Sequence, residues 1–596
     1  MGGGEAIHSA GAGWPVDSVL DGCNELLCKF CPKTVLLEPQ TSILEDKIMN
    51  LILKRSSFCA FTIALLALGA CAQVSPSTSN VEPGTLVEAA VPAPTAQAVV
   101  SITPDVPHDV PGGQRLPASD ASNEVLAQFA WQQFLALTWQ SDYNATSNSR
   151  GAPDTAWDHS QPYTAGQPLV WETFAHRSEL RPFGVPLDTP FSKAPTYLFG
   201  VNTTPAEADD SFALFNNLDE DSEIGSANIY LGTGDPASQD LVLYQAKVNQ
   251  SEYDYIKDNF GATQFEKYTD PAKTRPSALQ AAQTANKNSI KNNLAPATDG
   301  LNLPAGDNSV AGRAGEGAIE IKTAFIRVTS ENESQFTNFF KTSAIYYTAD
   351  VDQGTGVYSN FVYHNGTFAL LGIHIIHKTK SYPDFIFTSF EHKELKNMDF
   401  QYILTSPLPP EYAGSDFNPH NVPTPPTGTP AGSQIGNRVA VQREQQNVAP
   451  ASATSVLYPI PSVIQSTNTA VHQQLQAVNP NSIWLNYILM GVQANITESW
   501  ADSASGTAGP NHFMANHVIE SDTFLGHFFG PGFGSNPFAN DDNILYQGET
   551  SSMGGCKGCH GVAQTSFGTD FSFLLDYGAN KPVNQPDTII YHPEEL

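Results

Sequence analysis

The segment Ala318–Val328 reads "AIEIKTAFIRV", and its pattern decides the fold prediction. Apolar and β-branched residues recur at every second position, with charged residues between them, which is the pattern of a half-buried β-strand. The two predicted faces are Ile319, Ile321, Thr323 and Phe325 on one side, and Glu320, Lys322 and Ala324 on the other. We therefore expect a strand with one apolar face and one face that carries charge.

Two more apolar runs follow along the chain, and they are predicted to form a hairpin. Thr367–Lys378 reads "TFALLGIHIIHK" and Asp384–His392 reads "DFIFTSFEH", with "TKSYP" between them. Such nearly continuous apolar runs suit strands of a sheet that is covered on both faces.

Helices are predicted at both ends of the strand-rich region. Ser122 is expected to cap the first helix. The apolar stripe expected on that helix is Leu126, Ala130, Phe134 and Leu137, with Trp131 and Trp139 near it. "SIWLNYILMGVQ" at Ser482–Gln493 and "NHFMANHVIESDTF" at Asn511–Phe524 are predicted to be late helices. The order of one helix, many strands and then helices predicts the α+β class, with a large strand-rich body and helices near both of its ends.

Residues 49–71 have the order of a secretory signal peptide. Lys54 and Arg55 precede an uncharged stretch from Phe58 to Ala70, which is too short to span a membrane. Because a signal should start the chain, we expect translation to begin at Met49 rather than Met1. The predicted parts are a non-native extension at 1–48, the signal at 49–71, a linker rich in Pro, Ala and Ser at 72–119, and a globular body at 120–596.

The end of the apolar stretch resembles a bacterial lipobox. In Leu68–Cys71, Cys71 would be lipidated and become the mature N-terminus. The same stretch also offers Ala70 and Ala72 to an ordinary signal peptidase, which would release a soluble periplasmic protein. We expect the lipid anchor, because a cysteine at this position has no structural use otherwise. The protein would then lie on the periplasmic side of a bacterial membrane.

The charge of the chain argues against one class of partner. The formal net charge is −31, from 60 acidic against 29 basic residues, and no basic cluster is present. Nucleic acid is therefore not an expected partner. An acidic surface is instead suited to steering a basic redox protein.

The motif that points to chemistry lies near the end of the sequence. Cys556, Cys559 and His560 form Cys-x-x-Cys-His, the pattern by which c-type haem is attached. Each thiol adds to one vinyl group of the porphyrin, and the adjacent histidine reaches the iron. Residues 545–596 are therefore predicted to be the haem c segment, with one covalent haem and His560 as an iron ligand.

Two other uses of this cysteine pair, a zinc site and a redox-active pair, fit the sequence less well. A structural zinc site needs four ligands, and no second cysteine pair exists downstream of the leader. A thioredoxin-like redox pair is expected near a βαβ pattern, whereas the surroundings here are rich in Gly and Phe. Once the leader is removed, Cys556 and Cys559 are the only internal cysteines, so none is left for a structural disulfide.

The segment around the motif resembles c-type cytochromes. "FLALTW", "VWETF", "EIKTAF", "GIHIIHK" with "FTSFEH", and "SIWLNY" are also similar to landmarks of a group of large bacterial proteins that carry a single haem c. Class I cytochromes c supply a methionine ligand well downstream of the motif. This chain departs from that pattern, since no methionine follows His560.

The sixth iron ligand must therefore come from upstream. Met514, Met490 and His374 are the candidates, and His377 is expected on the opposite face of the strand from His374. A strong second ligand predicts electron transfer with a periplasmic redox partner. An open position predicts a peroxidase- or oxygenase-like haem enzyme, in which Glu391 and His392 would serve as an acid–base pair.

Overall fold

The computed structural model describes most of the chain from Val100 onward. The described residues are 100–117, 119–144, 149–164, 166–180, 187–195, 197–198, 215–218, 227–232, 240–261, 277–291, 297–351, 358–398, 400–404, 438–441, 460–495, 516, 518–519, 543–546, 549–552, 555–575 and 589–590. Met514, Cys71 and most of the predicted helix at 511–524 lie outside these ranges.

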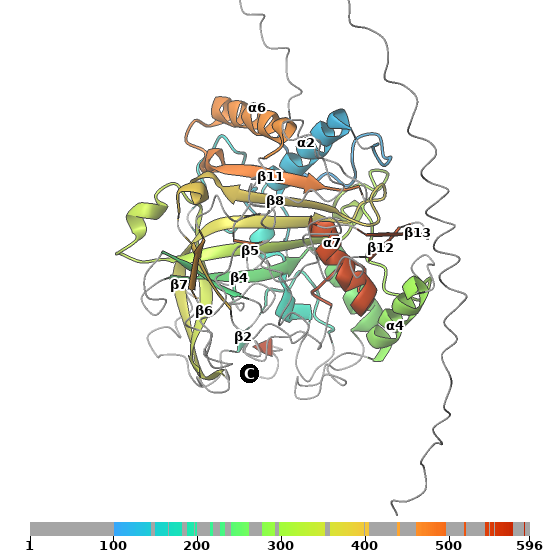
Figure 1. The fold of residues 1–596 in the computed structure, drawn as a ribbon. Helices are drawn as coiled ribbons and strands as arrows, with labels where there is room; N and C mark the ends of the chain where they lie inside the picture. The colour runs from blue at the N-terminus through green and yellow to red at the C-terminus, as the bar shows by residue number, and fades with distance from the viewer. Residues whose placement is uncertain are drawn as a thin grey trace, which may run out of the picture. The chain divides into compact units, whose positions relative to one another are not determined.

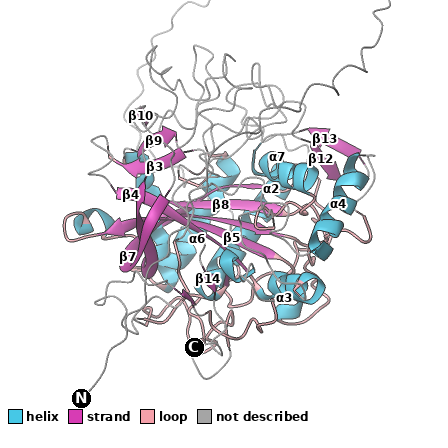
Figure 2. Cartoon of the chain, turned by 90° about the horizontal axis from the view of Figure 1, so that it is seen from below, coloured by secondary structure: helices cyan, strands magenta, loops and turns pink. Residues whose placement is uncertain are grey.

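A large antiparallel sheet is the centre of the fold. Its main path runs β10-β9-β3-β4-β5-β7-β8-β11, with β1 paired to β4 and β6 paired to β7, and Figure 2 shows β10, β9 and β3 together at one end. The strands of this sheet are β1 (Ala175–His176), β3 (Ala227–Leu231), β4 (Asp240–Val248), β5 (Ile319–Val328), β6 (Lys341–Val351), β7 (Tyr358–His377), β8 (Ile386–His392), β9 (Phe400–Leu404), β10 (Arg438–Val441) and β11 (Tyr487–Gln493). Two small pairs stand apart: β12 (Asn543–Tyr546) with β13 (Glu549–Ser552), and β14 (Ile589–Ile590) with β2 (Tyr197–Leu198).

The strand and hairpin predictions are confirmed. β5 pairs with β7 so that Lys322 lies opposite His374 and Glu320 opposite Ile376. β7 then pairs with β8 across the short connection that the sequence predicted, with His374 opposite Ser389. These pairings align the two predicted faces across the sheet, so one face carries Glu320, Lys322 and His374.

The described helices cover both faces of the sheet. They are α2 (Asp120–Leu137), α3 (Gln250–Phe260), α4 (Ser277–Lys291), α6 (Ser462–Val478) and α7 (Gly555–Val562). None of them is long and apolar enough to cross a membrane. The first helix is confirmed, but its cap is Ser119, whose side chain accepts a hydrogen bond from the Ser122 backbone N–H. Ser119, rather than Ser122, is the N-cap because its backbone is extended and it directly precedes the first helical turn.

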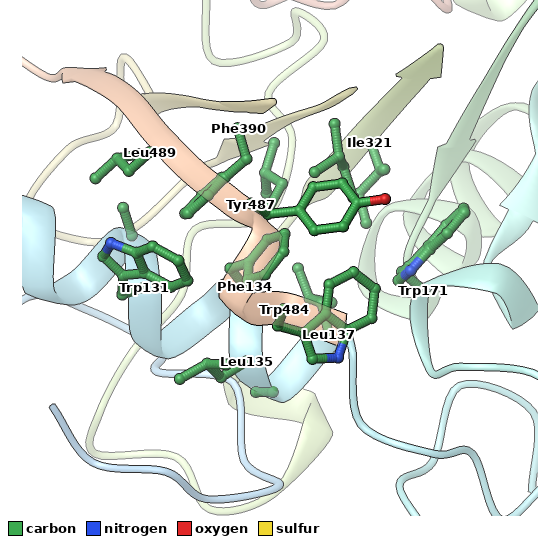
Figure 3. Close-up of a cluster of buried hydrophobic side chains, with 14 of the residues drawn as sticks. Trp131, Phe134, Leu135, Leu137, Trp171, Ile321, Phe390, Trp484, Tyr487 and Leu489 are labelled. Atoms are coloured by element: carbon green, nitrogen blue, oxygen red, sulfur yellow. The ribbon is translucent and has the colours of Figure 1, made fainter. Parts of the chain in front are cut away.

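Helices α2 and α6 pack together over β8 and β11 (Figure 1). Trp131 and Phe134 of α2 contact Phe390 of β8, with ring centroids 5.0 and 4.2 Å apart. Figure 3 shows Trp484 and Tyr487 in the same cluster. We call the sheet face under α2 and α6 the apolar face, and the opposite face, which carries Glu320, Lys322 and His374, the polar face.

The prediction of a helix at Ser482–Gln493 is wrong. A short 3-10 helix at Ile483–Asn486 leads directly into strand β11. β11 pairs with β8, and its residues are buried almost throughout. A short apolar run that is buried on both faces has no clear period, so periodicity alone cannot separate a strand from a helix.

The predicted boundary of the body at residue 120 is also too late. Val100, Val106 and Val110 fall in the predicted linker, yet they are buried against the core under α2 and α6. A composition rich in Pro and Val does not distinguish an irregular packed arm from a tether, so the packed body begins by Val100. With these corrections, the helices and the antiparallel sheet confirm the α+β class.

Helix α6 provides a matched test of this packing. Leu475 is fully buried, whereas Val478, three residues on, is 40% exposed. Replacing Leu475 with Ala should lower the free energy of unfolding by about 2–5 kcal/mol, because the substitution leaves a cavity in the core. Val478→Ala should change it by less than about 0.5 kcal/mol. Urea unfolding of both variants measures the difference, and equal effects would contradict this placement of α6.

Candidate haem-attachment site

The two motif cysteines lie one turn apart on α7 and are both buried. Cys556 is 4% exposed and Cys559 is 6% exposed. Their spacing of three residues places both thiols on one side of the helix. They belong to a buried apolar cluster that includes Phe385, just before β8, Phe387 in β8, and Phe571 in the segment after α7. The thiols therefore share a buried cluster with aromatic side chains, and neither forms a disulfide with a described residue.

His560 is held in one orientation by the backbone. Its Nδ1 lies 2.7 Å from the carbonyl oxygen of Phe571. A carbonyl oxygen can only accept, so Nδ1 carries the proton and donates, which leaves Nε2 as the nitrogen with a lone pair. Burial, and then the neighbouring His374, lower the pKa of His560 to about 3. The imidazole is therefore neutral, as a metal ligand must be.

The fold brings His374 beside His560. The ring centroids are 5.9 Å apart and the ring planes differ by 28°. His374 is 6% exposed on the polar face of β7, and Phe387 from β8 lies 5.0 Å from the His560 ring. A metal bound at about 2 Å from one nitrogen of each imidazole would hold two rings at roughly this separation. Among the sequence candidates for the sixth ligand that the structure describes, His374 makes a ring contact with His560.

His377 lies on the apolar face, as the alternation of the strand predicted. Its Nε2 donates to the Glu316 carbonyl oxygen at 2.5 Å, and its Nδ1 is 3.2 Å from the Gln133 side-chain oxygen of α2. Burial lowers the pKa of His377 to about 4. It is therefore a neutral core histidine that packs against Phe129 of α2.

The structure also bears on the methionine candidates for the sixth ligand and on the predicted acid–base pair. Met490 is 5% exposed and lies at an irregularity in the pairing of β11 with β8, while Met514 lies outside the described residues. Glu391 and His392 are consecutive in β8 and point to opposite faces. His392 stacks on Phe339 and hydrogen-bonds to the Asn338 carbonyl. An acid–base pair of Glu391 and His392 is thus excluded by the alternation of the strand.

A buried lysine within the motif fastens α7 to the sheet. The Lys557 ammonium is fully buried, and it donates to Asp384 Oδ2 at 2.7 Å and to the carbonyls of Phe385 and Ala494 at 3.0 and 2.8 Å. Arg115 also pairs with Asp384. The position of Lys557 between the two cysteines does not reveal its partners, so the sequence alone gives no sign of this role.

The segment after α7 has an unusual backbone. A π-helical turn at Ala563–Phe567 ends at Gly568, whose φ is +73°. Among the described residues, only Phe385, Asp570 and Phe571 combine a side chain with a positive φ. Phe385 and Phe571 supply the carbonyls that hold Lys557 and His560. Backbone strain of this kind persists only where the surrounding structure fixes it, and it gathers at functional sites.

The same segment is fixed to the body by hydrogen bonds. Asp570 accepts from Lys378 at 2.5 Å and from the Leu303 backbone N–H at 2.6 Å. Gln283 of α4 donates to the Leu575 carbonyl at 2.7 Å. These contacts hold the carbonyl of Phe571, and with it His560, in place.

The donor set fits a covalently attached haem c. Two thiols lie on one helix face, one imidazole presents Nε2, and the thiols belong to a buried cluster that contains aromatic side chains. In the part of the chain that the structure describes, no three His, Cys, Asp or Glu side chains gather to hold a metal ion. A four-ligand zinc site therefore finds no ligand set among those residues.

Comparison of the chain with known protein families, with curated proteins and with solved structures finds no match.

The buried Lys557 makes a testable contribution to stability. Lys557→Met should lower the free energy of unfolding by about 3–5 kcal/mol, because it leaves buried carbonyls and a carboxylate short of a donor. The control is Lys380→Met: Lys380 is 64% exposed and pairs with Asp307 at 3.0 Å. That variant should lose less than about 1 kcal/mol. Denaturant unfolding compares the two, and a small loss for Lys557→Met would show that this lysine does not hold α7.

Proposed function

We propose that this protein is an exported c-type cytochrome that carries one covalent haem and transfers electrons. The observation that carries the proposal is the arrangement of Cys556, Cys559 and His560. Both thiols are buried on one side of α7, and the Phe571 carbonyl orients His560 so that Nε2 is available.

Each residue of the site has a distinct role in this proposal. Cys556 and Cys559 hold the haem through thioether bonds, and His560 binds the iron through Nε2. The haem, when bound, supplies one-electron chemistry. The hydrogen bond from Nδ1 to the Phe571 carbonyl keeps the imidazole in one tautomer and raises its strength as a ligand. The aromatic side chains around the thiols exclude water.

The position of His374 favours electron transfer over catalysis. A second imidazole close to His560, with its ring plane 28° from that of His560, would be suited to binding the same iron. A closed iron passes electrons and does not bind small molecules. The alternative is a peroxidase- or oxygenase-like enzyme with an open iron site, and it would require His374 to stand away from the iron.

The location and the partner are part of the same proposal. Haem c is attached outside the bacterial cytoplasm, and residues 49–71 have the order of an export signal that ends at a lipidation cysteine, Cys71. We infer a lipid-anchored protein on the periplasmic side of a membrane. Its net charge of −31 would attract a basic redox partner rather than nucleic acid.

Covalent attachment can be tested with the two thiols. The double variant Cys556→Ala with Cys559→Ala should lose all haem from the denatured chain, because no thioether can form. The protein is expressed in a host competent for cytochrome maturation, and haem is stained on a denaturing gel. A double variant that still stains would refute covalent attachment through this motif.

The role of His374 can be tested by spectroscopy. The wild-type protein should show low-spin reduced haem that is indifferent to carbon monoxide, since His560 and His374 would both bind the iron. His374→Ala should turn the haem high-spin and allow carbon monoxide to bind. His377→Ala is a control, because His377 lies on the opposite face of the same strand. Carbon monoxide binding by the wild type would favour the enzyme instead.

A further inference from the structure

Two buried glutamates lie together beside the haem-attachment segment. Glu252 of α3 is fully buried, and Glu320 of β5 is 6% exposed. Their carboxyl groups are close enough to influence each other's charge, and the Ser572 side chain lies near Glu320. Both oxygens of Glu252 and Oε1 of Glu320 are buried without a hydrogen-bond donor among the described residues. Neither residue has a role in binding the haem in the proposal above.

Local structure explains why Glu252 points inward. It lies three residues after Asn249, the N-cap of α3, where a glutamate often turns back to the N-cap backbone N–H. Here that N–H donates to the Ile319 carbonyl at 3.0 Å instead. The Asn249 side-chain oxygen also accepts from the Ile319 N–H at 3.1 Å. These two bonds fasten the start of α3 to the start of β5, which brings Glu252 near Glu320.

The closeness of the two buried carboxyls favours a bound proton. Neither oxygen of Glu252 receives a hydrogen bond from a donor among the described residues. Two carboxylates can only accept hydrogen bonds, so neither can stabilise the other unless one of them is protonated. Two negative charges close together away from water would also repel each other strongly. The pair therefore retains at least one proton.

The surroundings of the pair place a second protonation near neutral pH. Burial, and then the charge of Glu320, raise the pKa of Glu252 well above its usual value. Burial also raises the pKa of Glu320 to about 7. The charged groups that face the pair are Asp570 and Lys378, which form an ion pair with each other at 2.5 Å. Since their charges offset, the local charge changes mainly with the protons on the pair.

A short path connects this pair to His560. Phe571 lies between Asp570 and Ser572 in the chain. Asp570 faces the pair, and the Ser572 side chain lies near Glu320. The Phe571 carbonyl is the group that holds His560 Nδ1. On the sheet, Glu320 lies opposite Ile376, two residues from His374 on the same polar face. The pair is thus linked to both histidines of the site.

We propose that Glu252 and Glu320 form a proton-binding site that takes up one proton when an electron enters the protein. This inference rests on the proposed haem c function. The electron comes from the redox partner and the proton comes from solvent. The only bond that forms is an O–H bond on the pair, and the net charge of the site is unchanged. The protein would then move a proton with each electron.

The test measures the reduction potential of the haem against pH in the holoprotein. In the wild type, the midpoint potential should fall as the pH rises around neutrality, by up to about 59 mV per pH unit, the value for one proton per electron. Glu320→Gln and Glu252→Gln should each remove about half of this slope or more. Glu333→Gln makes the same chemical change at a residue that is 69% exposed, and it should keep the wild-type slope.

A second measurement does not involve electron transfer. Because the pKa of Glu320 is raised on folding, the unfolded state gives up its proton at lower pH than the folded state does. The Glu320 proton should therefore make wild-type stability fall as the pH rises from about 5 toward 7, and the proton that Glu252 keeps should extend the fall to higher pH. Glu320→Gln should show a shallower fall between about pH 5 and 7 than the wild type, because it lacks the Glu320 proton. Denaturant unfolding at several pH values measures the fall in both proteins.

The outcomes separate the two proposals. A wild-type slope that Glu320→Gln and Glu252→Gln leave unchanged would overturn the proton-binding site, while the haem spectrum would still support the cytochrome. A flat wild-type potential would overturn it as well. Absence of any haem spectrum in the purified protein would instead refute the proposed function, and the unfolding measurement would then still report whether the pair holds a proton near neutral pH.

Discussion

Successive residues of a strand point to opposite sides of the sheet, and the central strands of this protein use that constraint to keep two environments apart. On β7, His374 stands on the polar face beside His560, while His377 stands on the apolar face against α2. β8 divides in the same way, with Phe390 under α2 and Phe387 beside His560. A shift of β7 by one residue would exchange its two histidines, so the register that builds the core also builds the site.

The site is then fixed by a small number of buried polar contacts. Lys557 fastens the start of α7 to Asp384, and Asp570 fastens the segment after it to Lys378. Between these two points the Phe571 carbonyl orients His560. Buried ion pairs contribute little net stability because desolvation offsets their attraction, but breaking one is costly. Their contribution here is best understood as positioning: they hold a strained backbone so that one imidazole nitrogen is presented.

The central strands and the faces of their histidines could be predicted from the sequence because they depend on local pattern. The alternation of Ala318–Val328 predicted a strand, and the short polar segment "TKSYP" between two apolar runs predicted a hairpin. Alternation along the first of those runs also placed His374 and His377 on opposite faces. Other features depend on contacts between distant segments. The sequence of β11 predicts a helix wrongly, because a strand that is buried on both faces shows no alternation of apolar and polar residues. The partners of Lys557, and the closeness of Glu252 to Glu320, require the order of β4, β5, β7 and β8, which no local pattern contains.

The placement of the buried carboxyls bears on why the body around one motif is so large. Attaching a porphyrin needs only a short helix, two thiols and an imidazole. Holding two glutamates close together next to that helix needs α3, the start of β5 and the segment after α7 to meet at one point. Burying a carboxyl pair is unfavourable unless a proton is kept on the pair. A sheet with helices on both faces provides a water-excluded setting in which such a proton would stay bound, and Ser572, which lies near Glu320, is the residue after the Phe571 carbonyl that orients His560.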